Sequence, residues 1–332
     1  MRFMRSSRNR DGLPDLAEID ATWKRLRGRV ARTPLMDLTG SRLEPDLPEG
    51  ARVWMKMELF QKAGSFKARG VTLAVDALPD GAEVIAASGG NHALAMASAA
   101  GTRAHLIMPE AADPGTVAAC EALGATIERT PGTKTDLALL AARAEETGRV
   151  PLHPFESRHM ILGAATCGYE IVKTQPELDA VIVPVGGGGL IAGVALAVKL
   201  FSPACEVIGV EPEGADSISR SLTAGEPVVL DQVETMAVSL AAPRAEPLTF
   251  GAIQKHVDEV VRLPDAAFPP AMRRMREALS LMVEPACAAA LAALTGPLRD
   301  RLAGKRVAII ACGSNISDAN WDRLAAAQPS RP

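Results

Sequence analysis

The sequence predicts an α/β protein of two domains, each containing a parallel sheet, with a ligand-binding cleft between them. Three observations lead to this prediction. Short β-rich apolar runs alternate with helical stretches along the chain, several of these runs lack any polar alternation, and turns rich in glycine or asparagine follow them. A length of 332 residues also suits two domains.

The strand and helix pairs can be followed in chain order. The first strand, near 52–58, places Val53, Met55 and Met57 on one face, and helical spacing follows over 64–78. The later pairs are expected at 83–88 with 91–101, 104–109 with 114–124, 179–185 with 189–201, 206–211 with 214–222, and 305–312 with 315–326. The uninterrupted apolar runs at 181–185 and 307–311 predict strands that are covered on both faces.

Two interruptions indicate where one domain is inserted into the other. Two prolines break the helical pattern within 149–159, and a turn-rich stretch lies at 77–83. We therefore expect a small inserted domain at 80–157. The larger domain is then discontinuous and consists of 14–79 and 158–326. The basic stretch at 1–13 is expected to be a flexible tail.

Composition excludes several classes of protein. A net charge of −3 and an aromatic content of 3% argue against nucleic acid as a partner. No run of about 18 uninterrupted apolar residues is present, so no membrane span is expected. The five cysteines are scattered and contain no CxxC pair, which predicts a reduced protein of the cytoplasm.

The loop GSFKARG places a lysine among glycines near a helix start. If Ser65 caps that helix, Lys67 lies in its first turn and points its amine at the cleft. The helix dipole disfavours positive charge there, so the pKa of Lys67 should fall. A neutral amine is what a Schiff base requires. Lys67 is therefore predicted to be a covalent anchor.

The loop VGGGGLIAG follows an expected buried strand and opens a helix. Its glycines let backbone amides approach an anion at a helix N-terminus, and no P-loop lysine follows. This predicts a phosphate cradle. An NAD site is the alternative, because Gly187, Gly189 and Ala192 match the dinucleotide pattern and Glu211 stands where a ribose-binding acid would lie.

Two more loops follow expected parallel strands. In SGGNHALA, Ser88, Asn91 and the amides of a helix start offer donors for a carboxylate. In ACGSNIS, Cys312 taken alone is typical of a small core residue. Because the carboxyl ends of parallel strands meet at one edge, all four loops are expected at the same cleft.

Taken together, GSFKARG, SGGNH, GGGG and CGSN resemble the fold type II pyridoxal phosphate (PLP) enzymes, in particular the serine/threonine dehydratase and serine racemase branch. The resemblance runs from RTPL at Arg32 through KMELFQKAGSFKARG, HPF, GVEPEGAD and VEPA to CGSN. It implies PLP as cofactor, a small hydroxy amino acid as substrate, and a homodimer.

The resemblance also implies roles for particular residues. Lys67 would bind PLP covalently and act as the catalytic base. The other cofactor contacts would be Phe66, Asn91 to the ring 3-oxygen, Gly186, Gly187, Gly188, Gly189 and Leu190 to the phosphate, and Cys312 to the pyridine nitrogen. The substrate carboxylate would meet the loop formed by Ser88, Gly89, Gly90, Asn91 and His92. A thiol beside the ring nitrogen does not enforce its protonation, which favours elimination over reprotonation.

The chain departs from the family pattern at three places. At the family's cation site Glu211 and Ala215 match, but Ser217 replaces the third ligand and Asp216 is shifted by one. A divalent ion, a monovalent ion and no ion therefore all stay open, and weak divalent activation is expected. The family segments GQGT and ADG read here GAAT, at 163–166, and AVS, at 237–239, which weakens threonine as the substrate.

The predicted activity is that of a PLP-dependent ammonia-lyase, which converts a β-hydroxy amino acid to a 2-oxo acid and ammonia. Serine, threonine and a bulkier 3-hydroxy relative are the candidate substrates. The alternatives are an amino-acid racemase, a β-replacement enzyme of the same fold and an NAD-dependent oxidoreductase. Gly89 lies where serine racemases carry a serine that donates a proton to the substrate. Elimination is therefore expected to exceed racemisation.

Overall fold

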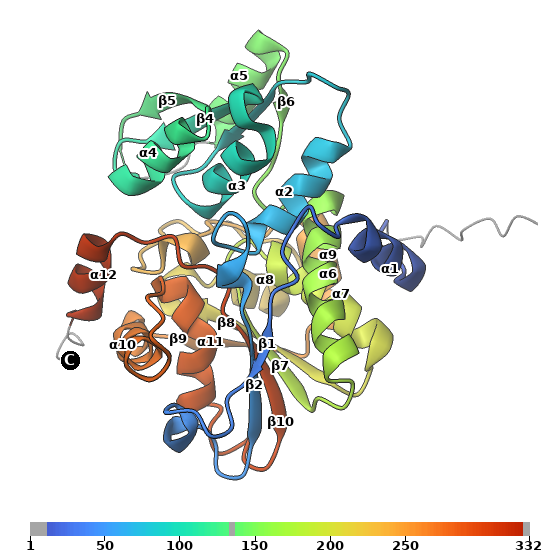
Figure 1. Cartoon of the computed structure of the whole chain (residues 1–332), viewed down its shortest axis with the longest axis vertical. Coiled ribbons are helices and arrows are strands. Elements are labelled where there is room, and N and C mark those ends of the chain that lie inside the picture. The colour runs from blue at the N-terminus through green and yellow to red at the C-terminus, as the bar shows by residue number, and fades with distance from the viewer. Residues whose placement is uncertain (1–11, 133–136, 328–332) are drawn as a thin grey trace, which may run out of the picture.

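The chain forms two sheets, which occupy separate parts of the computed structural model (Figure 1). The structure describes residues 12–132 and 137–327; most of the expected tail lies outside them. The larger sheet has the strand order β1-β2-β10-β7-β8-β9. Its strands are β1 Leu35–Asp37, β2 Arg52–Lys56, β7 Ala180–Pro184, β8 Glu206–Pro212, β9 Glu259–Leu263 and β10 Arg306–Ile310.

The smaller sheet has the order β5-β4-β3-β6. Its strands are β3 Val84–Ala87, β4 Ala104–Pro109, β5 Thr126–Thr130 and β6 Val150–Pro151. All four lie within the segment expected to be inserted. The domain boundaries at 80 and 157 themselves stay a prediction.

Helices cover both sheets (Figure 1). Those packed with the smaller sheet are α3 Asn91–Ala100, α4 Pro114–Ala122 and α5 Leu137–Thr147, and α2 Lys67–Asp76 joins the two parts. Those of the larger part are α1 Leu16–Arg25, α6 Arg158–Thr174, α7 Gly189–Phe201, α8 Ser217–Ala224, α9 Pro247–His256, α10 Phe268–Leu279, α11 Pro285–Thr295 and α12 Asp318–Ala325. Short 3-10 turns include η5, Val238–Leu240. No helix of the described residues has the length and apolar character needed to cross a membrane.

The expected strand and helix pairs are present, and the described strands pair in parallel with one exception. Strand β1 runs antiparallel to β2 at the edge of the larger sheet. Three residues are too short a run to show a hydrophobic pattern, so the sequence did not predict this strand. Strands β7 and β10 pair side by side in the middle of the sheet. Nearly all of their residues are buried, as their apolar runs predicted.

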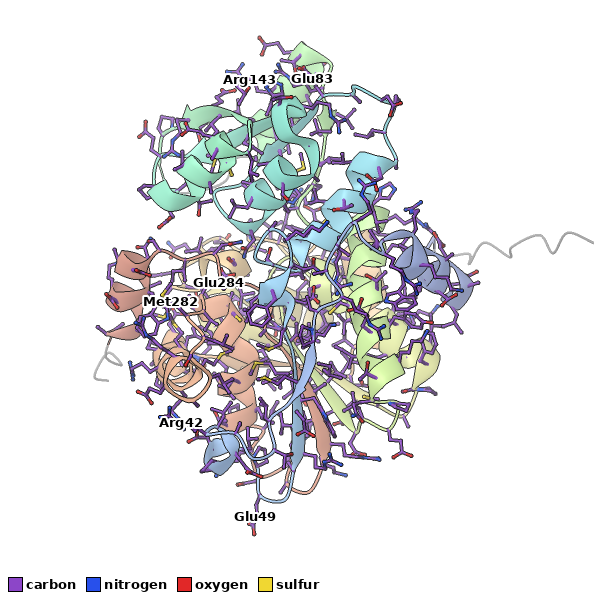
Figure 2. The ribbon with its side chains drawn as sticks, in the orientation of Figure 1. Arg42, Glu49, Glu83, Arg143, Met282 and Glu284 are labelled. Carbon is purple, nitrogen blue, oxygen red and sulfur yellow. The ribbon has the colours of Figure 1, made fainter. Side chains whose placement is uncertain are left out.

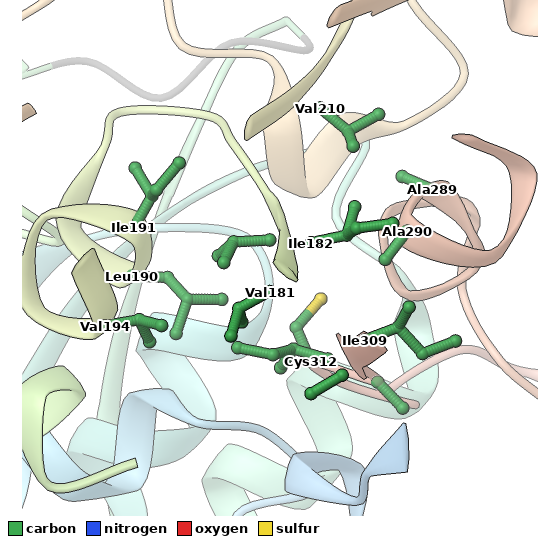
Figure 3. Close-up of a cluster of buried hydrophobic side chains, with 14 of the residues drawn as sticks. Val181, Ile182, Leu190, Ile191, Val194, Val210, Ala289, Ala290, Ile309 and Cys312 are labelled. Atoms are coloured by element: carbon green, nitrogen blue, oxygen red, sulfur yellow. The ribbon is translucent and has the colours of Figure 1, made fainter. Parts of the chain in front are cut away.

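The main core lies between the larger sheet and the helices on its two faces. Figure 3 shows Val181 and Ile182 of β7 and Ile309 of β10 between side chains of α7 and of α11. The Cys312 sulfur lies in the same cluster, just beyond the end of β10. The carboxyl end of β10 is thus anchored in the core before the chain enters the cleft.

The start of helix α2 differs from the prediction. The helix begins at Lys67 with Phe66 at the cap position, and Ser65 does not cap it. Ser65 instead forms an isolated antiparallel bridge with Gly313, and its hydroxyl has no hydrogen-bond partner among the described residues. The reason is tertiary, because the bridge holds the Ser65 backbone beside the chain that leaves β10. Lys67 nevertheless lies in the first turn, as expected.

A buried ionic network fixes α2 on the larger sheet. Arg69, 1% exposed, makes five hydrogen bonds to Glu58, Glu170 and Thr166. Lys56 completes the network with a bond of 2.6 Å to Glu170 and another of 2.7 Å to the Thr33 carbonyl. Burial by itself raises the pKa of Glu58, but Arg69 and Lys56 hold that pKa below its ordinary value. Two cations thus neutralise two carboxylates inside the protein.

We predict that Arg69→Met destabilises the protein by about 3–5 kcal/mol, because it leaves an uncompensated buried carboxylate. Arg143→Met is the control, since Arg143 pairs with Glu128 and Glu146 at the surface, where such pairs contribute less than about 1 kcal/mol. Urea unfolding followed by circular dichroism measures both. Adding Glu58→Gln to the Arg69 variant should restore part of the loss. A loss for Arg69→Met no larger than that of the control contradicts the prediction.

Candidate active site

The four loops singled out in the sequence meet at the carboxyl ends of the strands. The Phe66 amide donates to the Cys312 carbonyl at 3.1 Å. Asn315, in the loop after β10, donates its side-chain amide to Asn91 Oδ1 at 2.7 Å. Asn91 begins α3, so this bond joins the smaller-sheet part to the larger one. The predicted lysine, carboxylate and ring-nitrogen loops therefore lie together.

Lys67 is partly buried in this cleft. Its Nζ donates a short hydrogen bond to the Pro154 carbonyl and lies 5.0 Å from the Phe66 ring centre. Burial lowers the pKa of the Lys67 amine to about 8. No carboxylate among the described residues makes an ion pair with it. The amine is therefore partly neutral near neutral pH, as a nucleophile or base must be.

Two histidines near Lys67 are also neutral. Burial, with the positive charge of Lys67 second, lowers the pKa of His92 to about 3 and that of His153 to about 4. His92 Nε2 lies 3.0 Å from the Leu152 carbonyl, and His92 Nδ1 has no partner among the described residues. His153 Nδ1 accepts the Phe155 and Glu156 amides. Neither imidazole adds charge to the cleft at neutral pH.

The glycine-rich loop begins α7 and has no room for side chains. Gly188 has a φ of +84°, which favours glycine. A Cβ on Gly187 would lie 2.4 Å from the Phe155 ring, and one on Gly186 would lie 2.9 Å from the Leu240 backbone. The loop thus places backbone amides at a helix N-terminus with no side chains on its four glycines. This arrangement fits a phosphate group.

Asn91 contacts a buried acid that the sequence did not identify. Its Nδ2 donates to Glu284 Oε1 at 2.6 Å and to Ser239 Oγ at 3.3 Å. Ser239 Oγ also donates to Glu284 Oε2. Burial raises the pKa of Glu284, although both hydrogen bonds oppose the rise. Figure 2 shows Glu284 at the start of α11, where the larger part faces the smaller one.

The thiol of Cys312, in the loop after β10, is neutral. A hydrogen bond with Cys287 and burial raise the pKa of the Cys312 thiol well above its ordinary range. Cys287 lies in α11, and the side chains of both cysteines are buried. An uncharged thiol is only a weak hydrogen-bond donor and acceptor and has no charge to pair with a protonated ring nitrogen.

The loop 88–92 forms the N-terminus of α3. Ser88 Oγ accepts the Gly90 amide at 3.3 Å, and a Cβ on Gly90 would meet no atom within 4 Å. A Cβ on Gly89 would lie 3.2 Å from Ala112 and Pro109, which is crowded. The His92 imidazole uses Nε2 to hydrogen-bond the Leu152 carbonyl, so the donor that His92 can offer to an anion is its backbone amide. Free amides and open space at Gly90 suit a carboxylate.

Glu211, which the sequence offered both as a ribose-binding acid and as a cation ligand, already accepts hydrogen bonds from its own chain. Glu211 is 0% exposed, and its carboxylate accepts the Ile218 and Ser219 amides and the Ser219 hydroxyl. Burial raises its pKa to about 7. Because the carboxylate is fully buried and already accepts three hydrogen bonds, a ribose could not reach it in this arrangement. Glu211 instead caps helix α8.

Asp216, the carboxylate shifted by one position at the predicted cation site, pairs with two arginines. Asp216 bonds Arg220 at 2.8 Å and Arg262 at 3.1 Å, so it is not a third ligand beside Glu211. Among the described residues no group of three or more His, Cys, Asp or Glu side chains is placed to hold a metal. The ion pairs of Asp216 support the prediction of weak divalent activation. Glu211 and Ala215 as ligands stay a prediction.

Several residues of the site had a motif in the sequence but no assigned role. Glu284 stands in VEPA, Asn315 in CGSN, Pro154 in HPF and Ser239 in AVS. Their contacts depend on chain segments more than 80 residues apart. An isolated acid before a proline, or a serine in a turn, carries no periodic signal that could have marked it.

Comparison with known proteins gives a consistent result. Residues 26–313 match the family model described as pyridoxal-phosphate dependent enzyme. The chain is 42% identical to a phenylserine dehydratase of Ralstonia pickettii, over 94% of this chain and 96% of that protein. It is 34% identical to a beta-hydroxyaspartate dehydratase of Paracoccus denitrificans, over 92% and 97%. The structure of maize serine racemase superimposes with a TM-score of 0.85 at 34% identity, covering 93% and 96%.

We predict that His92 makes the protein sensitive to acid. Its pKa is about 3 when folded and about 6.5 when unfolded, so between these values the unfolded state binds more protons. Stability therefore falls as the pH drops below about 6.5, and His92 alone should cost about 2 kcal/mol at pH 5 relative to pH 7.5. Urea unfolding at both pH values measures the difference.

His92→Gln should remove about this share of the pH dependence, because glutamine can still donate to the Leu152 carbonyl but does not titrate. Equal pH dependence in the His92 variant and the wild type shows that burial of His92 is not the cause.

Proposed function

Because the chain belongs to the family of pyridoxal-phosphate dependent enzymes and is a lyase of the hydroxy amino acid dehydratase kind, we propose that Lys67 is its cofactor-binding lysine and catalytic base. The observation that carries this proposal is the position of Lys67, in the cleft, with its pKa lowered by burial to about 8. The reaction converts a β-hydroxy amino acid to a 2-oxo acid and ammonia.

The residues present fit the cofactor. The four glycines 186–189 and the Leu190 amide would hold its phosphate at the N-terminus of α7. Asn91 would contact the ring 3-oxygen, Phe66 would pack beside the ring, and the neutral Cys312 thiol would face the ring nitrogen. When bound, the cofactor withdraws electrons from the substrate Cα and so acidifies the Cα proton.

The other residues would orient the amino acid. Its carboxylate would accept the amides of the loop 88–92, and the open space at Gly90 admits it without a clash. Lys67 Nζ would then remove the proton from Cα. The neutral histidines matter here, because a second positive charge beside Lys67 would repel the proton that this amine must accept.

Loss of the β-hydroxyl completes the elimination. The C–O bond breaks, and the hydroxide leaves as water only if it receives a proton. The ammonium that Lys67 has become carries a proton, and an acid near the phosphate is the other source. The enamine product then tautomerises to an imine, which water hydrolyses to the 2-oxo acid and ammonia.

Location and assembly are also part of the proposal. All five cysteines are free and buried, which supports a reducing compartment such as the cytoplasm. A homodimer is carried over from the resemblance alone. We also propose that divalent cations activate the enzyme only weakly. The ion pairs of Asp216 with Arg220 and Arg262 support this proposal.

We predict that the purified protein carries PLP on Lys67. Borohydride should fix the cofactor there as a stable secondary amine, and mass mapping of peptides locates the label. Lys67→Ala should lower 2-oxo acid formation by at least about 10² to 10⁴-fold, the usual range for a lost general base. Lys62→Ala is the control, since Lys62 is exposed and donates to the Gly28 carbonyl. A label on any other lysine rejects the assignment.

We predict further that elimination exceeds racemisation. Gly89 has no side chain to return a proton from the face opposite Lys67, so the Cα carbanion is expected to lose its hydroxyl first. Chiral chromatography of D-serine and an assay of pyruvate follow both outcomes from L-serine. D-serine forming as fast as pyruvate favours the racemase alternative instead.

A further inference from the structure

Val238 is an apolar side chain left uncovered beside the site. It is 77% exposed, the most exposed of the large apolar residues described. Its neighbours in the turn η5 show where this turn lies. Ser239 bonds both Asn91 and Glu284, and the Leu240 backbone packs against Gly186. The turn η5, which carries Val238, therefore lies beside the loops of the proposed cofactor site.

A second apolar group faces the same region. The ring of Phe155 packs on Gly187, its backbone and Cβ lie against Gly189, and the ring meets the His153 ring edge-on, with 4.6 Å between centroids. Phe155 directly follows Pro154, whose carbonyl accepts the Lys67 amine. The ring is only partly buried. The aromatic ring of Phe155 thus belongs to the residue next to Pro154, which Lys67 contacts.

The charges of the cleft disfavour a second carboxylate on the substrate. Among the described residues around it, the two histidines are neutral, and Arg244 pairs with Glu246 at 2.6 Å. When Glu284 is ionised, its negative charge would repel a second carboxylate on the substrate. Lys67 is then the remaining cation, and the reaction requires it as a base. A β-carboxylate would have no dedicated partner here.

We infer that the site selects 3-hydroxy amino acids with a bulky apolar β-substituent of the phenyl class, and that Val238 and Phe155 form the surface that receives it. This inference rests on the proposed function. The exposed valine is covered when the substrate binds, and the Phe155 ring supplies an aromatic contact. Removing apolar surface from water on both partners supplies the selectivity.

The test compares kcat/KM for L-threo-3-phenylserine, L-serine and L-threo-3-hydroxyaspartate, with the 2-oxo acid as product. Wild-type enzyme should prefer phenylserine to serine by about tenfold or more and turn over hydroxyaspartate least. Val238→Asp and the nearly isosteric Val238→Thr should each reduce the preference for phenylserine over serine, the first by about tenfold or more.

Val229→Asp is the matched control, because Val229 is also exposed, at 65%, and lies outside the turn η5. It should leave all three values unchanged. Wild-type preference for hydroxyaspartate or serine overturns the inference. A phenylserine preference that neither Val238 variant alters overturns the role of Val238.

A binding measurement separates this inference from the proposed function. L-phenylalanine lacks the β-hydroxyl and cannot be dehydrated, so calorimetry with the holoenzyme reports recognition alone. Its Kd should be at least about tenfold lower than that of L-alanine, and Val238→Asp should remove most of this difference. Tight phenylalanine binding without 2-oxo acid from any substrate rejects the proposed function but retains the inference. Equal affinity for the two amino acids overturns the inference.

Discussion

The bidentate contact of Arg69 with Glu58 is the interaction on which the site depends. It joins helix α2 to the chain that leaves strand β2, and Glu170 and Lys56 extend it to α6. Lys67 stands two residues before Arg69, at the first turn of the same helix. Since the network is almost fully buried and electrically balanced, the start of α2 has little freedom to move. The reactive amine is thereby held toward the cleft.

Charge neutrality around that amine is the second constraint. Desolvation keeps His92 and His153 uncharged, raises the pKa of Glu284 and lowers that of Lys67. All four effects have the same cause, because burial penalises the charged form of each group. The two imidazoles are therefore neutral at neutral pH, and burial shifts Glu284 and Lys67 toward their uncharged forms. This setting suits the role proposed for Lys67, which would alternate between amine and ammonium.

Binding of the phosphate, by contrast, is expected to rely on backbone rather than side-chain charge. No side chain of residues 186–189 lies over the amides at the start of α7, because all four are glycines, and Phe155 and Leu240 fill the space that side chains would need. The same two neighbours connect the phosphate loop to the lysine and to the turn η5. The proposed phosphate loop and the proposed substrate-contacting turn thus share one set of packing contacts.

The sequence by itself determined the alternation of strands and helices, the buried strands β7 and β10, and the four loops that meet at the cleft. These features follow from local patterns, namely apolar runs, glycine clusters and helix starts. Helix α11 was not predicted, because its apolar and small residues are buried on all sides and show no amphipathic period. Only the tertiary structure decided that Ser65 pairs with Gly313 instead of capping α2, that Glu211 caps α8, and that Glu284 meets Asn91. The Ser65 and Glu284 contacts join residues distant in the chain, and the Glu211 contact joins the end of β8 to the next helix; in each case packing decides which of several possible hydrogen-bonding partners is used.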